Sequence, residues 1–197
     1  MTSWNVRQPF VLFLLLTAIT GAIYPLLITG CAQFLFPHQA NGSLVELGTR
    51  TVGSELIGQH FAAPWYFWGR PSATEPSPYN AEASRGSNLG PLNPTLQVSV
   101  RQRLRLVTPA DASPDQPVPV DLVTSSGSGL DPHVSVLGAL YQVPRVARAR
   151  NLSQEEVQTL VRQNTEDRQW GVFGEPRVNV LRLNMALDRA SSIRTPR

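Results

Sequence analysis

The sequence has few of the side chains on which disulfides, metal sites and catalysis depend. Its single cysteine, Cys31, lies in an apolar stretch, so the rest of the chain has no disulfide and must be held together by packing. The three histidines (His38, His60 and His133) are far apart, and none has the spacing of metal ligands. No Gly-x-Ser-x-Gly element occurs, because Leu130 stands where the second glycine would be. We therefore predict no bound metal and no catalytic site in this chain.

A strong excess of charge is also lacking. The 17 basic residues are all arginine and face 14 acidic residues, which gives a formal net charge of only +3. Two arginine clusters are expected to be solvated helix faces rather than phosphate-binding patches: Arg101, Arg103 and Arg105, and Arg145, Arg148 and Arg150. No recognised nucleic-acid-binding motif accompanies them, so binding to nucleic acid is not supported.

What the sequence does contain is a long run without a charged side chain, from Phe10 to Phe36. As a helix this run would extend about 40 Å, more than the hydrocarbon core of a bilayer requires. Inside lipid its backbone must satisfy its own hydrogen bonds, which favours a helix. We predict a membrane-spanning helix over residues 10–36, with a kink or a packing point at Gly21 and Pro25.

The flanking charges suggest an orientation. Arg7 and the α-amino group precede the run, whereas the first charge after it is Glu46. The positive flank is expected in the cytoplasm, so residues 1–9 would be a short cytoplasmic N-terminus. Residues 37–197 would then form one domain outside the cytoplasm, at the bacterial inner membrane.

Two other interpretations of the apolar run stay open. A cleaved secretory signal would normally have a shorter apolar core of about 7–15 residues. A bacterial lipoprotein signal would end at Cys31, since Ile28, Thr29 and Gly30 precede it, but the chain stays apolar after the cysteine. The competing class of protein is therefore a free-standing envelope lipoprotein or binding module anchored through Cys31. Both alternatives also place most of the chain outside the cytoplasm.

The remainder predicts an α+β domain with long irregular loops and three or four helices on a small mixed sheet. A short strand or hairpin arm is expected at 44–51, strands at 118–122 and 178–181, and helices that begin at Pro94, at Asp131-Pro132 and after Ser153. The helix that begins at Asp131 should kink or restart at Pro144, and a last short helix should follow from 183 to 189. Ser153 and Glu156 form a capping box.

A segment rich in Pro, Ser, Asn and Gly runs from Gly69 to Pro94, directly after an aromatic cluster at residues 65–68. Loops this long are uncommon inside compact domains unless they are functional. We predict an ordered loop pinned on the surface, against a partner. The residues expected to dock on partners, in the span and in the domain, are Gly21, Pro25, Trp65, Tyr66, Phe67, Trp68, Arg70, Tyr79 and Asn80.

A second loop, Thr124 to Leu130, is made of small residues and precedes the helix expected at Asp131. A strand, a Gly/Ser loop and a helix N-terminus together can bind an anion, because free N–H groups and the helix dipole converge there. It is not a Walker loop, since no Gly-Lys-Ser/Thr follows. A simple capped turn between strand and helix is the favoured alternative.

These pieces, in this order, resemble the C subunit of the bacterial Kdp potassium-transporting ATPase, a P-type ATPase complex. The resemblance covers essentially the whole chain and rests on stretches at residues 21–27, 39–44, 53–59, 68–73, 79–80, 86–88, 121–124, 126–135, 142–147 and 149–152. It implies a non-catalytic one-span subunit that works beside a channel-like potassium-binding subunit, a P-type ATPase subunit that carries hydrolysis, and a small one-span peptide.

The same resemblance implies two roles. As a catalytic chaperone the chain would raise the ATP affinity of the ATPase subunit, with nucleotide contacts at Ser126, Gly127, Ser128, Gly129, Leu130 and Gln142. The charge bias places this domain away from cytoplasmic ATP, so direct contact would require the opposite orientation. We therefore favour a cap on the potassium entrance that supports assembly, with residues 65–68 and 69–94 as its docking surface.

Overall fold

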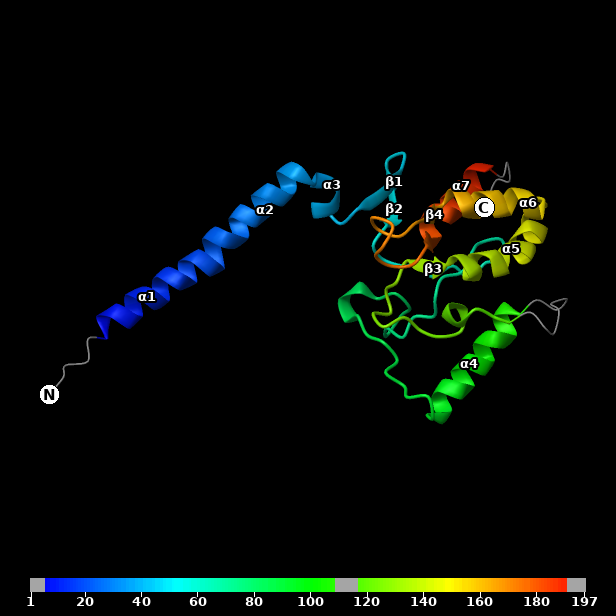
Figure 1. Ribbon diagram of the computed structural model, residues 1–197, viewed down its shortest axis with the longest axis horizontal. Helices are drawn as coiled ribbons and strands as arrows, with labels where there is room; N and C mark the ends of the chain where they lie inside the picture. Colours follow the sequence, from blue (N-terminus) through cyan, green and yellow to red (C-terminus); the bar gives the residue numbers. More distant parts are fainter. Residues whose placement is uncertain (1–5, 109–116, 191–197) are drawn as a thin grey trace. The chain divides into compact units, whose positions relative to one another are not determined.

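The computed structural model describes residues 6–108 and 117–190, which divide into two compact units, 1–44 and 45–197. The first unit contains the helical segments α1 (Arg7–Ala18), η1 (Ile19–Ile23), α2 (Tyr24–Leu35) and α3 (Pro37–Ala40) (Figure 1). The 29 residues Arg7–Leu35 form one helix, and its most apolar stretch of 18 residues has a mean hydropathy of 2.3 and is not buried at all. This helix is long and apolar enough to cross a membrane, as expected.

The expected irregularity near Pro25 is a change of helix type. Segment η1 is a π-helix, in which the backbone N–H of Tyr24 reaches the carbonyl oxygen of Ile19, five residues back. Pro25 has no N–H to donate and follows immediately, so the hydrogen-bonding pattern must shift at this point. Thr20 Oγ1 also donates to the carbonyl oxygen of Leu16, at 2.8 Å. Gly21 lies inside the π-helical segment, and Cys31 lies within α2, which continues to Leu35.

The chain then forms a hairpin and a long irregular segment. Strands β1 (Leu44–Leu47) and β2 (Arg50–Ser54) pair with each other, so the range 44–51, expected to be one short strand or hairpin arm, contains a hairpin turn at residues 48–49. Residues 55–93 follow with only the 3₁₀ turn η2 (Ala81–Ala83) among them. Helix α4 (Pro94–Val107) begins as predicted, because the Asn93 side chain accepts a hydrogen bond from the Thr95 N–H, at 2.9 Å.

The second half of the domain is a small sheet covered by helices. Strands β3 (His133–Ser135), β5 (Arg177–Asn179) and β4 (Thr165–Glu166) pair antiparallel in that order, with Val134 opposite Val178, so the prediction of a mixed sheet is wrong. The elements η3 (Val120–Leu122), α5 (Val136–Arg150), α6 (Gln154–Gln163) and α7 (Val180–Ala190) complete the domain. Figure 1 shows α5, α6 and α7 gathered at one end of the domain, while α4 lies along another side.

The core is built mainly from β-branched and leucine side chains of α5, α6, α7 and the sheet. Its fully buried members include Val134, Val143, Val146, Val157, Val161, Val178, Leu183 and Leu187, with Phe67 and Leu122 contributed by irregular segments. The capping box of α6 is present as predicted, since Ser153 and Glu156 exchange hydrogen bonds.

Three sequence predictions of secondary structure are wrong. The strand expected at 118–122 is instead the 3₁₀ turn η3, in which the Val120 side chain is exposed. The helix expected at Asp131-Pro132 begins only at Val136, because residues 133–135 pair with β5 as a strand. The terminal strand ends at Asn179, and the helix begins at Val180. In addition, α5 runs through Pro144 rather than restarting there.

Candidate functional site: an anchored aromatic segment and the loop beside it

The aromatic segment, residues 65–68, is held by two buried side-chain amides. The Asn184 amide of α7 accepts from the N–H of Phe67 at 2.8 Å and donates to its carbonyl at 3.0 Å. The Gln142 amide of α5 does the same for Trp68, at 2.8 and 3.1 Å. Asn184 and Gln142 are 2% and 3% exposed. Each amide thus replaces a strand partner for one residue of a segment that lies in no sheet.

Two arginines of α5 also hold the same segment. Arg145 Nη1 donates to the carbonyl of Tyr66 at 3.0 Å, and its guanidinium lies 3.8 Å from the centroid of the Trp68 ring. Arg150 Nε donates to the carbonyl of Trp65 at 2.8 Å, and Arg150 Nη2 pairs with Asp188 at 2.7 Å. Burial lowers the pKa of Arg145 to about 10, so its guanidinium group stays cationic at neutral pH. These two arginines are therefore not the solvated helix face that the sequence predicted.

The Tyr79 side chain is the centre of the loop that follows the aromatic segment. Its hydroxyl donates to the carbonyl of Arg70 at 2.5 Å, and burial raises the pKa of this phenol to about 12. Gly58 and Gly69 lie against the tyrosine, where an added Cβ would come within 2.3 Å of the ring and 2.6 Å of the hydroxyl oxygen. Ser72 Oγ accepts from the N–H of Tyr79 at 2.9 Å. The predicted ordering of this loop is confirmed, because its own side chains and backbone hold it.

The Gly/Ser loop, residues 126–130, packs against that ordered segment. Ser72 Oγ donates to the carbonyl of Gly129 at 2.7 Å, and Ser84 Oγ donates to the carbonyl of Ser128 at 3.0 Å. Gly129 has φ +69°, and a Cβ there would approach the carbonyl oxygen of Arg85 to 2.5 Å. The two loops that the sequence treated separately therefore form one surface. The Gly/Ser loop offers carbonyl oxygens to it, which are acceptors and not anion-binding donors.

The N-terminus of α5 is occupied by the chain itself. Asp121 Oδ2 accepts from the N–H of Ser135 at 2.6 Å, and Ser135 Oγ accepts from the N–H of Gly138 at 2.9 Å. An added Cβ at Gly138 would come within 2.9 Å of the Asp121 carboxylate. The anion site that the sequence left as the less favoured interpretation does not have the expected geometry, since residues 131–135 separate the Gly/Ser loop from α5 and a carboxylate already lies at the N-terminus of the helix.

The charged groups beside the Gly/Ser loop form a compact pair. Arg70 Nη1 lies 3.2 Å from Asp131 Oδ2, and Asp131 Oδ1 accepts from the backbone N–H of His133 at 3.0 Å. Burial alone would raise the pKa of Asp131, but the hydrogen bonds from His133 and the charge of Arg70 outweigh it and lower that pKa below its ordinary value. The sequence predicted that His133 would lie in the first turn of a helix, but the structure places it in β3.

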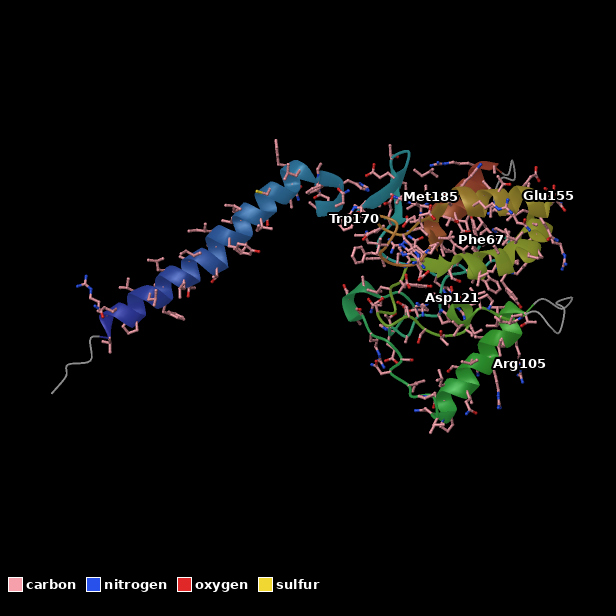
Figure 2. The ribbon with its side chains drawn as sticks, viewed as in Figure 1. Phe67, Arg105, Asp121, Glu155, Trp170 and Met185 are labelled. Atoms are coloured by element: carbon pink, nitrogen blue, oxygen red, sulfur yellow. The ribbon has the colours of Figure 1, made fainter. Side chains whose placement is uncertain are left out.

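The predicted docking residues are not equally accessible. Phe67 is 0% exposed and belongs to the core, so its side chain lies away from any surface a partner would meet (Figure 2). Tyr66, Trp68, Arg70, Tyr79 and Asn80 are half-buried, and Trp65 is 36% exposed.

Gln142, predicted to contact nucleotide, is buried and its amide hydrogen-bonds Trp68, Gly138 and Arg145. Ser126 is also buried, whereas Gly127 and Ser128 are exposed.

Sequence reasoning missed the most exposed aromatic cluster of the domain. Trp170 is 89% exposed, Val172 70% and Phe173 60%, and the two aromatic rings meet edge to face at 6.0 Å. They lie in a tight turn closed by a hydrogen bond from Gln169 N–H to the Phe173 carbonyl, and Figure 2 places Trp170 at the edge of the domain. The signal was present in the sequence Gln169-Trp170-Gly171-Val172-Phe173, an apolar group with a glycine turn at its centre.

The residues that the structure describes contain no cluster of His, Cys, Asp or Glu side chains able to hold a metal ion. Among the same residues, Ser128 and His133 are not hydrogen-bonded to each other, and the Ser128 hydroxyl accepts from the N–H of Leu130. The site is thus a hydrogen-bonded surface of ordered loops on a helical support.

Comparison with known proteins places this architecture in a family. A sequence model described as KdpC, K⁺-transporting ATPase, c chain, matches residues 6–189. A protein of Methylococcus capsulatus named potassium-transporting ATPase KdpC subunit is 59% identical over 185 residues, covering 93% of this chain and 97% of the relative. Proteins with the same name from Dechloromonas aromatica and Burkholderia ambifaria are each 58% identical, and cover 94% and 95% of this chain and 97% of each relative. The chain therefore belongs to the KdpC family.

Proposed function

We propose that this chain is a non-catalytic accessory subunit of an ATP-driven potassium uptake complex, in which a partner subunit carries ATP hydrolysis. The observation that supports this proposal most directly is the construction of the site. Two amide clamps and two arginines fix residues 65–68, and the 70–86 loop is fastened to the Gly/Ser loop. A surface held this rigidly suits docking, because little conformational entropy is lost when a partner binds.

In this proposal the apolar helix Arg7–Leu35 lies in the inner membrane against a channel-like potassium-binding subunit, a P-type ATPase subunit and a small one-span subunit. Gly21 and Pro25 mark the point where the helix changes type and where a neighbouring helix can approach closely. The domain lies outside the cytoplasm and caps the potassium entrance, and the loop 69–94 contacts the partner there. The chain thereby stabilises the assembly.

A charge reversal on the loop tests the docking surface. Glu82 is exposed in η2, and Glu82→Arg should reduce recovery of the partner subunits with this chain after mild detergent extraction. The matched control is Glu155→Arg, an equal change of charge on the exposed face of α6. Growth on limiting potassium should follow recovery of the complex. Equal recovery and growth for both variants would disprove docking through this loop.

Orientation is tested with single cysteines in a Cys31→Ser background. Val172→Cys, outside the loop 69–94, should react in intact cells with a maleimide that cannot cross the inner membrane, and Val6→Cys should not. Both side chains are exposed, at 70% and 71%, so reactivity reports the compartment and not burial. The opposite labelling pattern would place the domain in the cytoplasm. Cys31→Ser alone should leave processing and membrane attachment unchanged. A lipoprotein anchored through Cys31 would instead lose its processing and its lipid anchor in this variant.

Nucleotide contact at residues 126–130 and Gln142 stays a prediction, as does the chaperone role that depends on it. The buried amide of Gln142 already binds three residues of its own chain, so a contact there would require rearrangement. Ser128→Ala changes an exposed hydroxyl and leaves the buried contacts intact. If nucleotide binds at this loop, Ser128→Ala should lower the ATP affinity of the complex. An unchanged ATP affinity would argue against the contact.

A further inference from the structure

A cavity of about 440 Å³ lies between α4 and the segments 70–79 and 123–125, outside the Gly/Ser loop 126–130. Two arginines from different elements line it: Arg103 from α4 and Arg70 from the loop. No Asp or Glu occurs among its described lining residues. Part of its wall belongs to the loop 69–94, which is proposed to dock on a partner, but neither the docking proposal nor the nucleotide prediction uses Arg103 or the other α4 residues of the wall.

Arg103 is a partly buried cation with no counterion among the residues that the structure describes. Its Nε atom is buried and has no hydrogen-bond partner within the described chain. Burial lowers the pKa of Arg103, yet a guanidinium keeps its proton in proteins. The Tyr79 hydroxyl is the other titratable group that acts on it, and with its pKa raised to about 12 this phenol stays neutral. The charge of Arg103 is therefore not cancelled by its neighbours in residues 6–108 and 117–190.

Arg70 is only partly satisfied. Its Nη1 pairs with Asp131 at 3.2 Å and its Nη2 lies 3.4 Å from the carbonyl oxygen of Ser125. Its Nε, like that of Arg103, is buried without a hydrogen-bond partner in the part of the chain that the structure describes. Among the described residues, two guanidinium groups thus face one carboxylate, which leaves a net positive charge at the cavity. A partly desolvated positive charge without a full counterion is costly, and an anion bound beside it would lower that cost.

The remaining walls suit an anion with a small organic body. Ser99 and Gln102 of α4 offer neutral hydrogen-bonding groups, while Leu96 and Leu106 of the same helix are apolar. The volume lies within the range of about 300–1,000 Å³ that small-molecule sites occupy. Guanidinium groups match the planar or tetrahedral oxygen arrangement of carboxylates and phosphates. We propose that this cavity binds a compact organic anion, a phosphomonoester or a carboxylate, between Arg70 and Arg103.

The test uses the full chain in neutral detergent. Glycerol 3-phosphate and citrate are the soluble probes, compared with sodium chloride at the same ionic strength, and binding is measured by calorimetry and by the shift in Tm. A lipid headgroup presents the same phosphate chemistry, so a second arm uses nanodiscs of phosphatidylglycerol or of phosphatidylcholine. A shift with a soluble probe identifies a solute as the source. A shift only in phosphatidylglycerol identifies the headgroup.

The decisive variant is Arg103→Gln, and its matched control is Arg101→Gln, an exposed arginine on the same helix. Arg103→Gln should weaken anion binding at least about tenfold, because a charge-assisted hydrogen bond is lost. Without ligand its Tm should be equal to or above that of the parent, since an uncompensated charge is removed. Arg103→Lys should retain part of the affinity, as it keeps the charge without the planar fork.

Three results would overturn the proposal. The first is no anion-dependent shift with any soluble probe at millimolar concentration and none in phosphatidylglycerol. The second is an equal loss of anion binding in Arg101→Gln and Arg103→Gln. This result would show that the positive charge of the surface, and not the cavity, causes the anion-dependent shift in Tm. The third is a marked fall in the Tm of unliganded Arg103→Gln, which would show that Arg103 stabilises the fold and is not kept for a ligand.

Discussion

At the scale of single residues, the domain depends on polar side chains that sit in apolar surroundings. Asn184 and Gln142 lie among core residues, and each makes both hydrogen bonds of a backbone partner. Forming such a hydrogen bond contributes only modestly to the free energy of unfolding. Removing the side-chain amide costs more, because it leaves a buried backbone donor and acceptor unpaired. The aromatic segment is therefore positioned by two amides as well as by the buried side chain of Phe67.

Asn184→Leu should destabilise the domain by about 3 kcal/mol, because it leaves the N–H and the carbonyl of Phe67 buried and unpaired. Chemical unfolding of the detergent-solubilised chain measures this change. Gln97→Leu, a comparable change on the exposed face of α4, should alter the unfolding free energy by less than about 0.5 kcal/mol. A similar small effect for both variants would mean that the hydrogen bonds between Asn184 and the Phe67 backbone do not stabilise the domain.

Asp131 should make the free energy of unfolding decrease at acidic pH. Its pKa is lowered in the folded state, so the stability it contributes is fully present above the unfolded-state pKa of about 4 and is lost as pH falls through the folded-state value. Asp131→Asn should lower Tm at pH 7 and show a smaller further loss between pH 5 and acid. Parallel pH profiles of parent and variant would contradict this assignment.

At the scale of elements, the start of α5 decides how the Gly/Ser loop is used. Asp-Pro is a good helix start in sequence, so a helix at Asp131 was a reasonable prediction. The pairing of Val134 with Val178 turns residues 133–135 into a strand, and Asp121, 14 residues before Ser135, supplies the carboxylate at the real helix start. Local propensity loses here because the partner strand and the capping carboxylate come from distant parts of the chain.

Asp121→Ala should destabilise the domain by about 1–2 kcal/mol, since α5 would lose the acceptor for its first free N–H group and a favourable charge at its N-terminus. Thermal unfolding followed by circular dichroism measures the effect. Asp167→Ala removes an exposed carboxylate elsewhere and serves as the control. If both variants unfold at the parent Tm, Asp121 does not cap the helix.

At the scale of the whole molecule, the apolar helix and the domain are separate compact units. The core residues all lie between Phe67 and Leu187, and no residue of Arg7–Leu35 is among the buried side chains described. The helix thus adds little to the folding of the domain. Its exposed apolar surface requires lipid or a membrane partner instead.

A fragment that begins at Val45 should therefore fold without detergent. We expect a single cooperative unfolding transition, with a Tm within a few degrees of the domain transition in the full chain. Differential scanning calorimetry and near-ultraviolet circular dichroism measure this. A fragment with helical signal but no cooperative transition would show that the domain needs the first unit.

The sequence alone determined the features that depend on local chemistry. The charge-free run, the hairpin after it, the Asn93 and Ser153 caps and the family resemblance all follow from residues close together in the chain. Tertiary structure decided what distant contacts control: that Phe67 is buried, that Gln142 and Asn184 bind backbone, that Arg145 and Arg150 support aromatic residues, and that Arg70 meets Arg103 at one cavity. The physical reason is that burial and hydrogen-bond pairing are properties of packed surroundings, which spacing along the chain does not specify.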